Sequence, residues 1–508
     1  MNFHHRYFEN DSERHWIFRY ILIVLTVSLL LFVAGCSLAN RSETGTSTGD
    51  SNGSIYDNDP DGSANLKDPS SGGSENPKDP SSGGSTDPNE PSPPDNGSTE
   101  PNETFSAAND TGITDTSNPD SETGITIADE LRKQLLKMSL EEKIGQMMFP
   151  AFRTDTSGNP LIQINEQTKS AIQKFRPGGI ILFSENLATV PQTIAFIMEM
   201  QILIDIPLLI GIDEEGGVVS RFAVSKGLGA VAMPPAGTIG QTKDVKWAYK
   251  AAAATAEQLK TLGINVDFAP VADINTNPNN PVIGTRAYSN DPQITGNMVQ
   301  SAIQGFSDNG IVPVIKHFPG HGDTSTDSHD GLAVVPHDWT RMDSVELVPF
   351  QQAIDAGVSM VMTAHVHTPG ISDIDVPATL NHDILTKLLR TRLGFKGVII
   401  TDAMEMGAIT NEFGNDESIV MAVSAGADML LVPLSLESAC NALVQAVKDG
   451  KIKESRIDES VQRILILKKE YQIMETVQAM MLKSYRPDMM PNTEAYKKLV
   501  QNIADAAK

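Results

Sequence analysis

The sequence predicts an α/β protein whose folded part is a TIM-type (β/α)8 barrel. Two observations predict it: eight short apolar runs alternate with amphipathic stretches of helical length, and charged residues directly follow several of these runs. Most runs are continuously apolar, as expected for parallel strands that helices cover on both faces. A doubly wound open sheet is the competing fold. No Gly-x-Gly-x-x-Gly turn follows the first run, however, and the number of runs favours a closed barrel.

Composition narrows the possible functions. The chain has 508 residues, with 39 Lys and Arg against 64 Asp and Glu, which gives a net charge of −25. Nucleic-acid binding needs clustered cations to neutralise phosphates, and no block of Lys and Arg occurs, so we expect no nucleic-acid partner. The two cysteines, Cys36 and Cys440, are too few for a disulfide framework or a four-cysteine zinc site.

Residues 1–35 have the features of a lipoprotein signal peptide. Two arginines precede an apolar run over residues 21–34, which has the length of a signal-peptide core. The run ends in Val33-Ala34-Gly35-Cys36, which resembles a bacterial lipobox. We therefore expect Cys36 to carry a lipid that anchors the exported protein to the outer face of the bacterial cell membrane. The alternative is an ordinary anchor followed by a lone cysteine, and it also implies export.

Residues 36–124 have the composition of a disordered tether. They are rich in Ser, Gly, Asn, Asp, Pro and Thr, and contain too few large apolar residues to offset the entropy of ordering. An eleven-residue repeat begins at Lys67 and again at Lys78. Residues 41–122 contain 17 acidic and 3 basic residues, so they carry −14 of the net charge. A coil of this length reaches roughly 50 Å, which suits a domain that acts on a polymer near the membrane.

Residues 125–508 are expected to form one catalytic barrel with C-terminal helices. Ser139 and Glu142 form the pattern of a capping box at the start of a helix. Further helices are expected over 244–262, 381–393 and 458–471, and in the final stretch of the chain. The expected strands lie within 146–152, 179–183, 207–212, 264–268, 312–317, 360–364, 398–401 and 428–432.

Charged side chains after these strands are typical of a glycosidase, which needs one carboxylate to trap the anomeric cation and one acid to protonate the leaving oxygen. Asp402 follows the seventh strand and is the candidate nucleophile, although an aspartate there could instead cap the next helix. Asp327-Ser328-His329 lies in a Gly-rich loop, where Asp327 could orient His329 as a proton donor near neutral pH. A chance pairing in a surface loop is the alternative.

The motifs together resemble glycoside hydrolase family 3, and more narrowly its β-N-acetylhexosaminidase branch, the NagZ type. The resemblance spans roughly residues 130–475 and rests on three segments. They are Asp213-Glu214-Glu215-Gly216-Gly217 with Arg221, Lys316-His317-Phe318-Pro319-Gly320-His321-Gly322 with Asp327-Ser328-His329, and Thr401-Asp402-Ala403-Met404.

The resemblance implies a retaining reaction on terminal, non-reducing, β-linked N-acetylglucosamine, without a cofactor or metal. It makes Asp402 the nucleophile and His329, oriented by Asp327, the general acid and then base. The residues that it implies for gripping the sugar hydroxyls are Asp213, Arg221, Arg286, Lys316 and His317. The implied substrates are peptidoglycan fragments or chitooligosaccharides. One departure is Glu214, where this branch usually has Gln. The chain also leaves no room for the second αβα domain of many Gram-positive relatives.

Three other functions stay open. His365 and His367 have the spacing of two metal ligands on one face of a strand, which would fit a metal-dependent barrel hydrolase. A histidine acid does not repel an incoming phosphate, so phosphorolysis could replace hydrolysis. A decayed barrel could also serve as a non-catalytic wall-binding lipoprotein, although all three proposed catalytic residues are present in the sequence.

Overall fold

The computed structural model describes residues 127–325, 333–473 and 489–508, all of which belong to one compact unit. The expected signal peptide, lipid-bearing Cys36 and tether lie outside these residues, as do Asp327 and His329. In the part of the chain that the structure describes, no helix is both long and apolar enough to cross a membrane.

Eight parallel strands form a closed ring. They are β1 (Met148–Phe149), β2 (Gly179–Ile181), β3 (Leu209–Ile212), β6 (Val266–Asp267), β7 (Val312–Phe318), β9 (Met360–Thr363), β11 (Val398–Ile400) and β12 (Leu430–Leu431). Six of them, from β2 to β11, pair as one parallel sheet, and β1 pairs with β12. Single bridges from Ala151 to Ile181 and from Ile400 to Met429 join the two sheets. The expected barrel is thus confirmed, each expected strand is present, and the open sheet is wrong.

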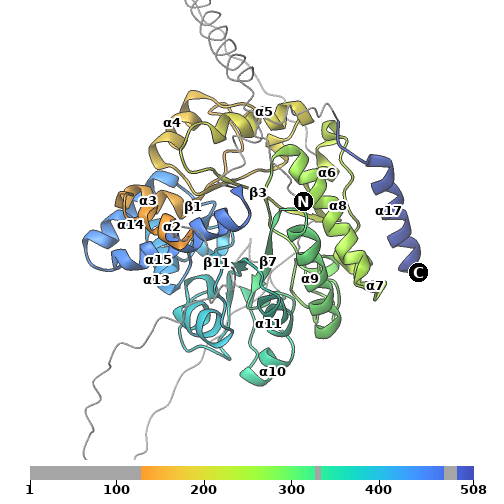
Figure 1. Ribbon diagram of the computed structural model, residues 1–508. Helices are drawn as coiled ribbons and strands as arrows, with labels where there is room; N and C mark the ends of the chain where they lie inside the picture. Colours follow the sequence, from red (N-terminus) through yellow and green to blue (C-terminus); the bar gives the residue numbers. More distant parts are fainter. Residues whose placement is uncertain (1–126, 326–332, 474–488) are drawn as a thin grey trace, which may run out of the picture. The chain divides into compact units, whose positions relative to one another are not determined.

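Helices surround the ring of strands (Figure 1). Those that follow the strands in turn are α4 (Glu166–Phe175), α5 (Val190–Gln201), α8 (Lys246–Leu262), α9 (Pro292–Ser307), α11 (Val348–Asp355), η5 (Asp383–Arg392), α13 (Asn415–Ala425) and α14 (Leu436–Lys448). The strands are buried on both faces because these helices cover the outside while side chains of the strands fill the inside. This burial on both faces explains why the strands are continuous apolar runs in the sequence.

Shorter elements line the two ends of the barrel or connect its units. The helical ones are α2 (Ile127–Leu135), α3 (Leu140–Gln146), η1 (Ser184–Asn186), α6 (Arg221–Val224), η2 (Lys226–Leu228), α7 (Ala236–Gln241), η3 (Gly284–Arg286), α10 (Trp339–Ser344), η4 (Ala378–Leu380) and α12 (Gly407–Thr410). The strands are β4 (Glu214–Gly216) with β5 (Val219–Ser220), and β8 (Ala333–Val334) with β10 (Val366–His367).

Several helices begin at a side-chain cap, as α3 does. Ser139 and Glu142 form the expected capping box at the start of α3, each side chain accepting the other's backbone N–H. The helix expected over 381–393 is present, but its residues 383–392 have π-helical turns, which the apolar spacing did not indicate.

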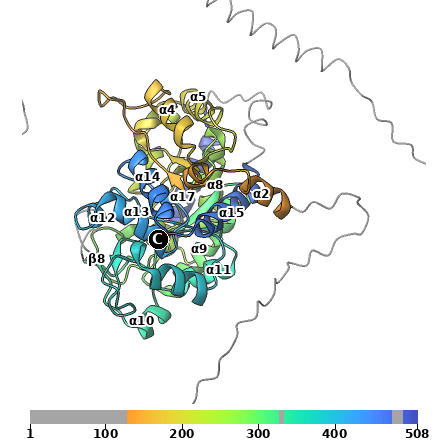
Figure 2. The same ribbon diagram turned by 90° about the vertical axis from the view of Figure 1, so that its left-hand side faces the viewer.

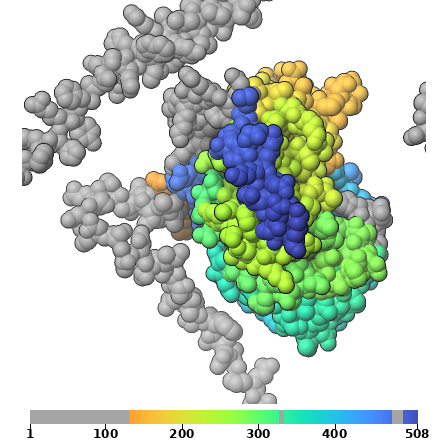
Figure 3. Space-filling view, turned by 90° about the vertical axis from the view of Figure 1, so that its right-hand side faces the viewer, coloured from red at the N-terminus to blue at the C-terminus, as the bar shows by residue number. Residues whose placement is uncertain are grey.

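Two helices complete the domain after the ring closes. Helix α15 (Glu454–Glu470) packs against α2 and α3, and Figure 2 shows it beside α2. Helix α17 (Thr493–Ala506) confirms the expected C-terminal helix and lies across α7 and α8 (Figure 3, dark blue). Tyr496 of α17 is buried and donates its hydroxyl hydrogen to Glu257 of α8.

Candidate active site

A cavity of about 440 Å³ opens at the carboxyl ends of the barrel strands. Its lining contains every described residue for which the sequence suggested a catalytic or substrate-binding role. These are Asp213, Arg221, Arg286, Lys316, His317 and Asp402. They come from the carboxyl end of β7 and from the connections after β3, β6 and β11, so the fold gathers them as a barrel gathers active-site groups.

Lys316 is the buried cation at the floor of the cavity. Its Nζ lies 2.8 Å from Oδ1 of Asp213 and 2.7 Å from Oε1 of Glu215. Burial alone would lower the pKa of Lys316, but these two carboxylates outweigh it and raise the pKa. The ammonium therefore stays charged, and Asp213 is held facing the cavity, where both groups can bind sugar hydroxyls.

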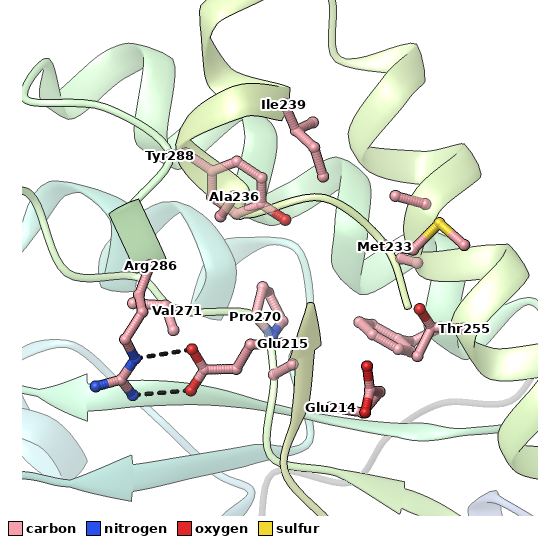
Figure 4. Close-up of a pocket in the computed structure, with 14 residues that line it drawn as sticks. Glu214, Glu215, Met233, Ala236, Ile239, Thr255, Pro270, Val271, Arg286 and Tyr288 are labelled. Atoms are coloured by element: carbon pink, nitrogen blue, oxygen red, sulfur yellow. Dashed lines mark hydrogen bonds and ion pairs between the residues drawn. The ribbon is translucent and has the colours of Figure 1, made fainter. Parts of the chain in front are cut away.

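Glu215 joins Lys316 to Arg286. The Nε and Nη2 atoms of Arg286 each donate to one oxygen of Glu215, both at 2.8 Å, and Figure 4 shows the two side chains face to face. Burial would raise the pKa of Glu215, yet Lys316 and Arg286 lower it to about 2. Two cations and two carboxylates thus form one network whose formal charges balance.

The hairpin of β4 and β5 explains which acids face the network. Side chains alternate along a strand, so Asp213 and Glu215 point to the cavity while Glu214 points away. Figure 4 shows Glu214 on the side of Thr255, at a small neighbouring cavity of about 30 Å³. The turn that follows needs glycine, because Gly216 and Gly217 have φ angles of 80° and 60° and a Cβ would meet the segment around Pro235.

Glu214 is almost fully buried. Its Oε1 accepts the Ser220 hydroxyl hydrogen at 2.6 Å and its Oε2 accepts the N–H of Phe222 at 3.0 Å. Burial raises the pKa of Glu214 to about 7 in spite of these hydrogen bonds. Since Ser220 is the N-cap of the short helix that begins with Arg221, Glu214 fixes the segment that carries a cation of the cavity.

His317 is oriented by a buried carboxylate. Its Nδ1–H donates to Oδ2 of Asp273 at 2.6 Å, and Nη2 of Arg286 lies 3.4 Å from the other ring nitrogen. Asp273 also accepts the backbone N–H of His317 and of His321. Burial would raise the pKa of Asp273, but the two histidines and these hydrogen bonds lower it. The imidazole is thus fixed with one nitrogen toward the cavity.

Asp402 lies at the end of β11 and lines the cavity. Its Oδ1 accepts the N–H of Ala403 at 2.8 Å. Burial would raise the pKa of Asp402, but the nearby His317 and His365 and this hydrogen bond lower it. The carboxylate is therefore ionised at neutral pH, as a nucleophile must be. It does not cap the next helix, because the N-cap of α12 is Met406, so that alternative is wrong.

Two arginines at the rim of the cavity lie against the ring of Phe183. The guanidinium groups of Arg153 and Arg221 lie 3.9 Å and 5.2 Å from the ring centre of Phe183. Arg221 also donates to Oδ2 of Asp213 at 3.4 Å, and Arg153 pairs with Glu405 at 2.5 Å. The cavity is thus lined by paired charges from floor to rim.

The proposed metal-ligand pair has other partners. Both ring nitrogens of the buried His365 are engaged inside the protein, with the Thr379 hydroxyl at 2.8 Å and the carbonyl oxygen of Ala403 at 3.0 Å. His367 lies 3.2 Å from Asp375. Within residues 127–325, 333–473 and 489–508, no three His, Cys, Asp or Glu side chains are grouped to hold a metal. His365 instead ties the end of β9 to the backbone next to Asp402.

Comparison with known proteins identifies the family. The profile of the "Glycosyl hydrolase family 3 N terminal domain" matches residues 139–467. The chain belongs to glycosyl hydrolase family 3. The matched residues contain the whole ring of strands and the six predicted site residues that line the cavity, as well as Asp327 and His329.

Relatives in family 3 agree with the branch that the sequence suggested. "Beta-hexosaminidase A" of Pseudoalteromonas piscicida is 34% identical over 58% of this chain. The chain spans only about half of that relative's length, 54%. "Beta-hexosaminidase LpqI" of Mycobacterium tuberculosis is 35% identical over 52% of this chain and 68% of its own. A solved family 3 β-N-acetylglucosaminidase from Paenibacillus sp. str. FPU-7 is 38% identical, with a TM-score of 0.68 over 73% of this chain and 69% of that one.

Sequence reasoning missed two acids of this family 3 site. Glu215 was part of the quoted motif, but no role was expected for it, although it pairs with both buried cations. Asp273 followed the fourth strand and was not singled out, although it orients His317. The roles of Asp327 and His329 stay predictions.

Proposed function

We propose that this protein is a retaining exo-β-N-acetylglucosaminidase, which hydrolyses terminal, non-reducing, β-linked N-acetylglucosamine. Membership of family 3 and the names of its relatives support the reaction class. The observation that carries the proposal is the ionised Asp402 in a cavity whose floor is the network of Asp213, Lys316, Glu215 and Arg286.

The proposed reaction has two displacements. Asp402 attacks the anomeric carbon and forms a covalent glycosyl-enzyme, while His329, oriented by Asp327, protonates the leaving oxygen. The same histidine then removes a proton from a water molecule, which releases the sugar and restores Asp402. The network at the cavity floor holds the hydroxyls of the sugar so that the anomeric carbon lies at Asp402.

The proposed setting is the outer face of a bacterial cell membrane, with a lipid on Cys36. The acidic, Pro- and Ser-rich composition of residues 36–124 supports a spacer between anchor and barrel. A domain held near the cell wall in this way would reach peptidoglycan fragments, and soluble chitooligosaccharides would reach it by diffusion.

The test is turnover of a chromogenic aryl β-N-acetylglucosaminide by the full chain, beside the matching β-glucoside. Assays with EDTA and with inorganic phosphate accompany it. We expect selective release from the N-acetyl substrate that EDTA does not reduce. Phosphate-dependent release with a sugar 1-phosphate product would instead establish a phosphorylase, and loss of activity in EDTA would establish metal dependence.

A pair of variants tests the nucleophile. Asp402→Asn removes the charge at nearly constant shape, and we expect turnover to fall by at least 10³-fold without a change in Tm. Asp373→Asn changes an exposed aspartate that does not line the cavity and should keep full activity. Wild-type turnover by Asp402→Asn would contradict the mechanism.

A further inference from the structure

A second large cavity lies at the opposite end of the barrel. It has a volume of about 550 Å³, and its charged lining residues are His382, Arg390, Lys396, Arg456, Glu459 and Arg463. Lys396 precedes β11 and the adjacent Asp428 precedes β12, whereas Asp402 of the catalytic cavity follows β11 and Val432 of that cavity follows β12. The two cavities therefore share no residue and open at different ends of the strands.

Three arginines of this cavity share a single buried carboxylate. Asp428 is fully buried and pairs with Arg390 through Oδ2, and with Arg463 and Arg456 through Oδ1 at 3.1 Å and 3.5 Å. Its oxygens also accept the N–H of Ile399 and the hydroxyl hydrogen of Ser460. A carboxylate offers about four lone-pair positions, so Asp428 is saturated and balances only one of the three charges.

The remaining positive charge has little compensation. Glu459 lies 3.9 Å from Nη2 of Arg463, and its side chain is 58% exposed, so this pair is weak. Lys396 is exposed and makes no ion pair with any residue that the structure describes. Asp383 lies on the same π-helix as Arg390, but it pairs with Lys387. Four permanent cations thus meet two carboxylates in a protein whose net charge is strongly negative.

The guanidinium groups of Arg390, Arg456 and Arg463 repel one another around Asp428. Burial together with Arg463 and Arg456 lowers the pKa of Arg390 to about 10, although Asp428 raises it. An anion in the cavity would relieve this repulsion. Guanidinium groups fit the oxygens of phosphate with paired N–H donors, and the cavity is open to solvent next to Arg463, whose side chain is 28% exposed.

We propose that this cavity is a binding site for a phosphate group carried by a larger ligand. Arg463 and Lys396 contact the phosphate, while Arg390 and Arg456 hold the site together through Asp428. The ligand chemistry is a phosphomonoester or phosphodiester, which a soluble metabolite, a lipid headgroup or a phosphate-containing polymer could present. The site is independent of the reaction at Asp402.

The experiment measures binding of glycerol 3-phosphate and inorganic phosphate to the full chain by calorimetry, with Tm as a second readout. We expect saturable binding that weakens as KCl screens the charges. Lys396→Gln should weaken it about threefold and Arg463→Gln at least tenfold, with unchanged turnover of the aryl substrate. Lys448→Gln, an exposed lysine elsewhere, and Arg221→Gln in the catalytic cavity should bind as the wild type does.

Two outcomes overturn the proposal. One is binding that Arg221→Gln removes and Lys396→Gln leaves intact, because the phosphate would then occupy the catalytic cavity. The other is the absence of saturable binding in the wild type. Because Lys396 is exposed and outside the Asp428 cluster, its variant should fold even if Arg463→Gln does not. Co-sedimentation with anionic or zwitterionic vesicles, and binding of a glycerol phosphate polymer, distinguish a lipid headgroup from a soluble source.

Discussion

Replacing Glu214 with Gln should make the stability of the barrel less dependent on pH. Gln keeps the shape of the buried side chain: its carbonyl oxygen can accept the N–H of Phe222 and its amide can donate to Ser220. The substitution therefore removes a titrating group and little else.

The size of the effect follows from the pKa of Glu214, which burial raises from 4.5 to about 7. Because the folded protein binds the proton more tightly, the favourable contribution of Glu214 is fully present below pH 4.5 and is lost as pH rises through 7. The difference between the two pKa values corresponds to about 3 kcal/mol of unfolding free energy. The pKa of the neighbouring Asp267 is also raised by burial, but this residue is present in both proteins.

The assay is urea unfolding of wild type and Glu214→Gln at pH 5 and pH 8. The unfolding free energy of Glu214→Gln, measured relative to the wild type, should be about 2 to 3 kcal/mol higher at pH 8 than at pH 5. For the control Glu417→Gln, at an exposed position on α13, the difference in stability from the wild type should be the same at both pH values. If the difference for Glu214→Gln is also the same at both pH values, Glu214 is ionised in the folded protein at pH 5 and the argument from burial fails.

Three further predictions concern the network, the acid and the anchor. Glu215→Gln should lower kcat/KM by at least 10²-fold and stability by about 3 to 5 kcal/mol, because it removes the carboxylate partner of Arg286 and leaves Lys316 with Asp213 alone; unchanged Tm and kinetics would contradict the network. His329→Ala should reduce turnover of substrates with poor leaving groups far more than that of activated aryl glycosides, and equal loss on both would remove His329 as the acid. Cys36→Ala should move the protein from the membrane fraction to the soluble fraction, and continued lipid labelling would refute the lipobox.

The strands and the main cavity residues could be predicted because burial leaves a direct pattern in the sequence. A parallel strand inside a barrel must be apolar on both faces, so the run at 398–400 stands out, and the first charged residue after it, Asp402, lines the cavity. The position of Asp402 follows from that argument alone. The role of Asp402 as nucleophile also depends on the neighbouring histidines and on Lys316. From the sequence, only the resemblance to family 3 indicated that these residues share a site with Asp402.

The contacts of the two missed acids, Glu215 and Asp273, depend on local backbone geometry, which the spacing of residues in the sequence does not determine. Three acids follow β3. Alternation along a strand points Glu214 to the opposite side from Asp213 and Glu215. This argument applies only once β4 is known to be a strand, and β4 has an irregular register. Asp273 reaches His317 because Val271 pairs with Lys316 in an isolated parallel bridge. The sequence places Asp273 and His317 44 positions apart, and nothing in this spacing indicates the contact.

The closure of the ring determines when the catalytic cavity can form during folding. The strand pair that seals the barrel joins Met148 to Leu430, which lie roughly 280 residues apart, so it has the largest loop-closure cost of the ring. Arg153 follows the first strand, and Val432 follows the last strand; both line the cavity. A nascent chain that lacks β12 therefore has Asp213, Lys316 and Asp402 but an open wall, and we expect turnover to appear only when the final strand has docked.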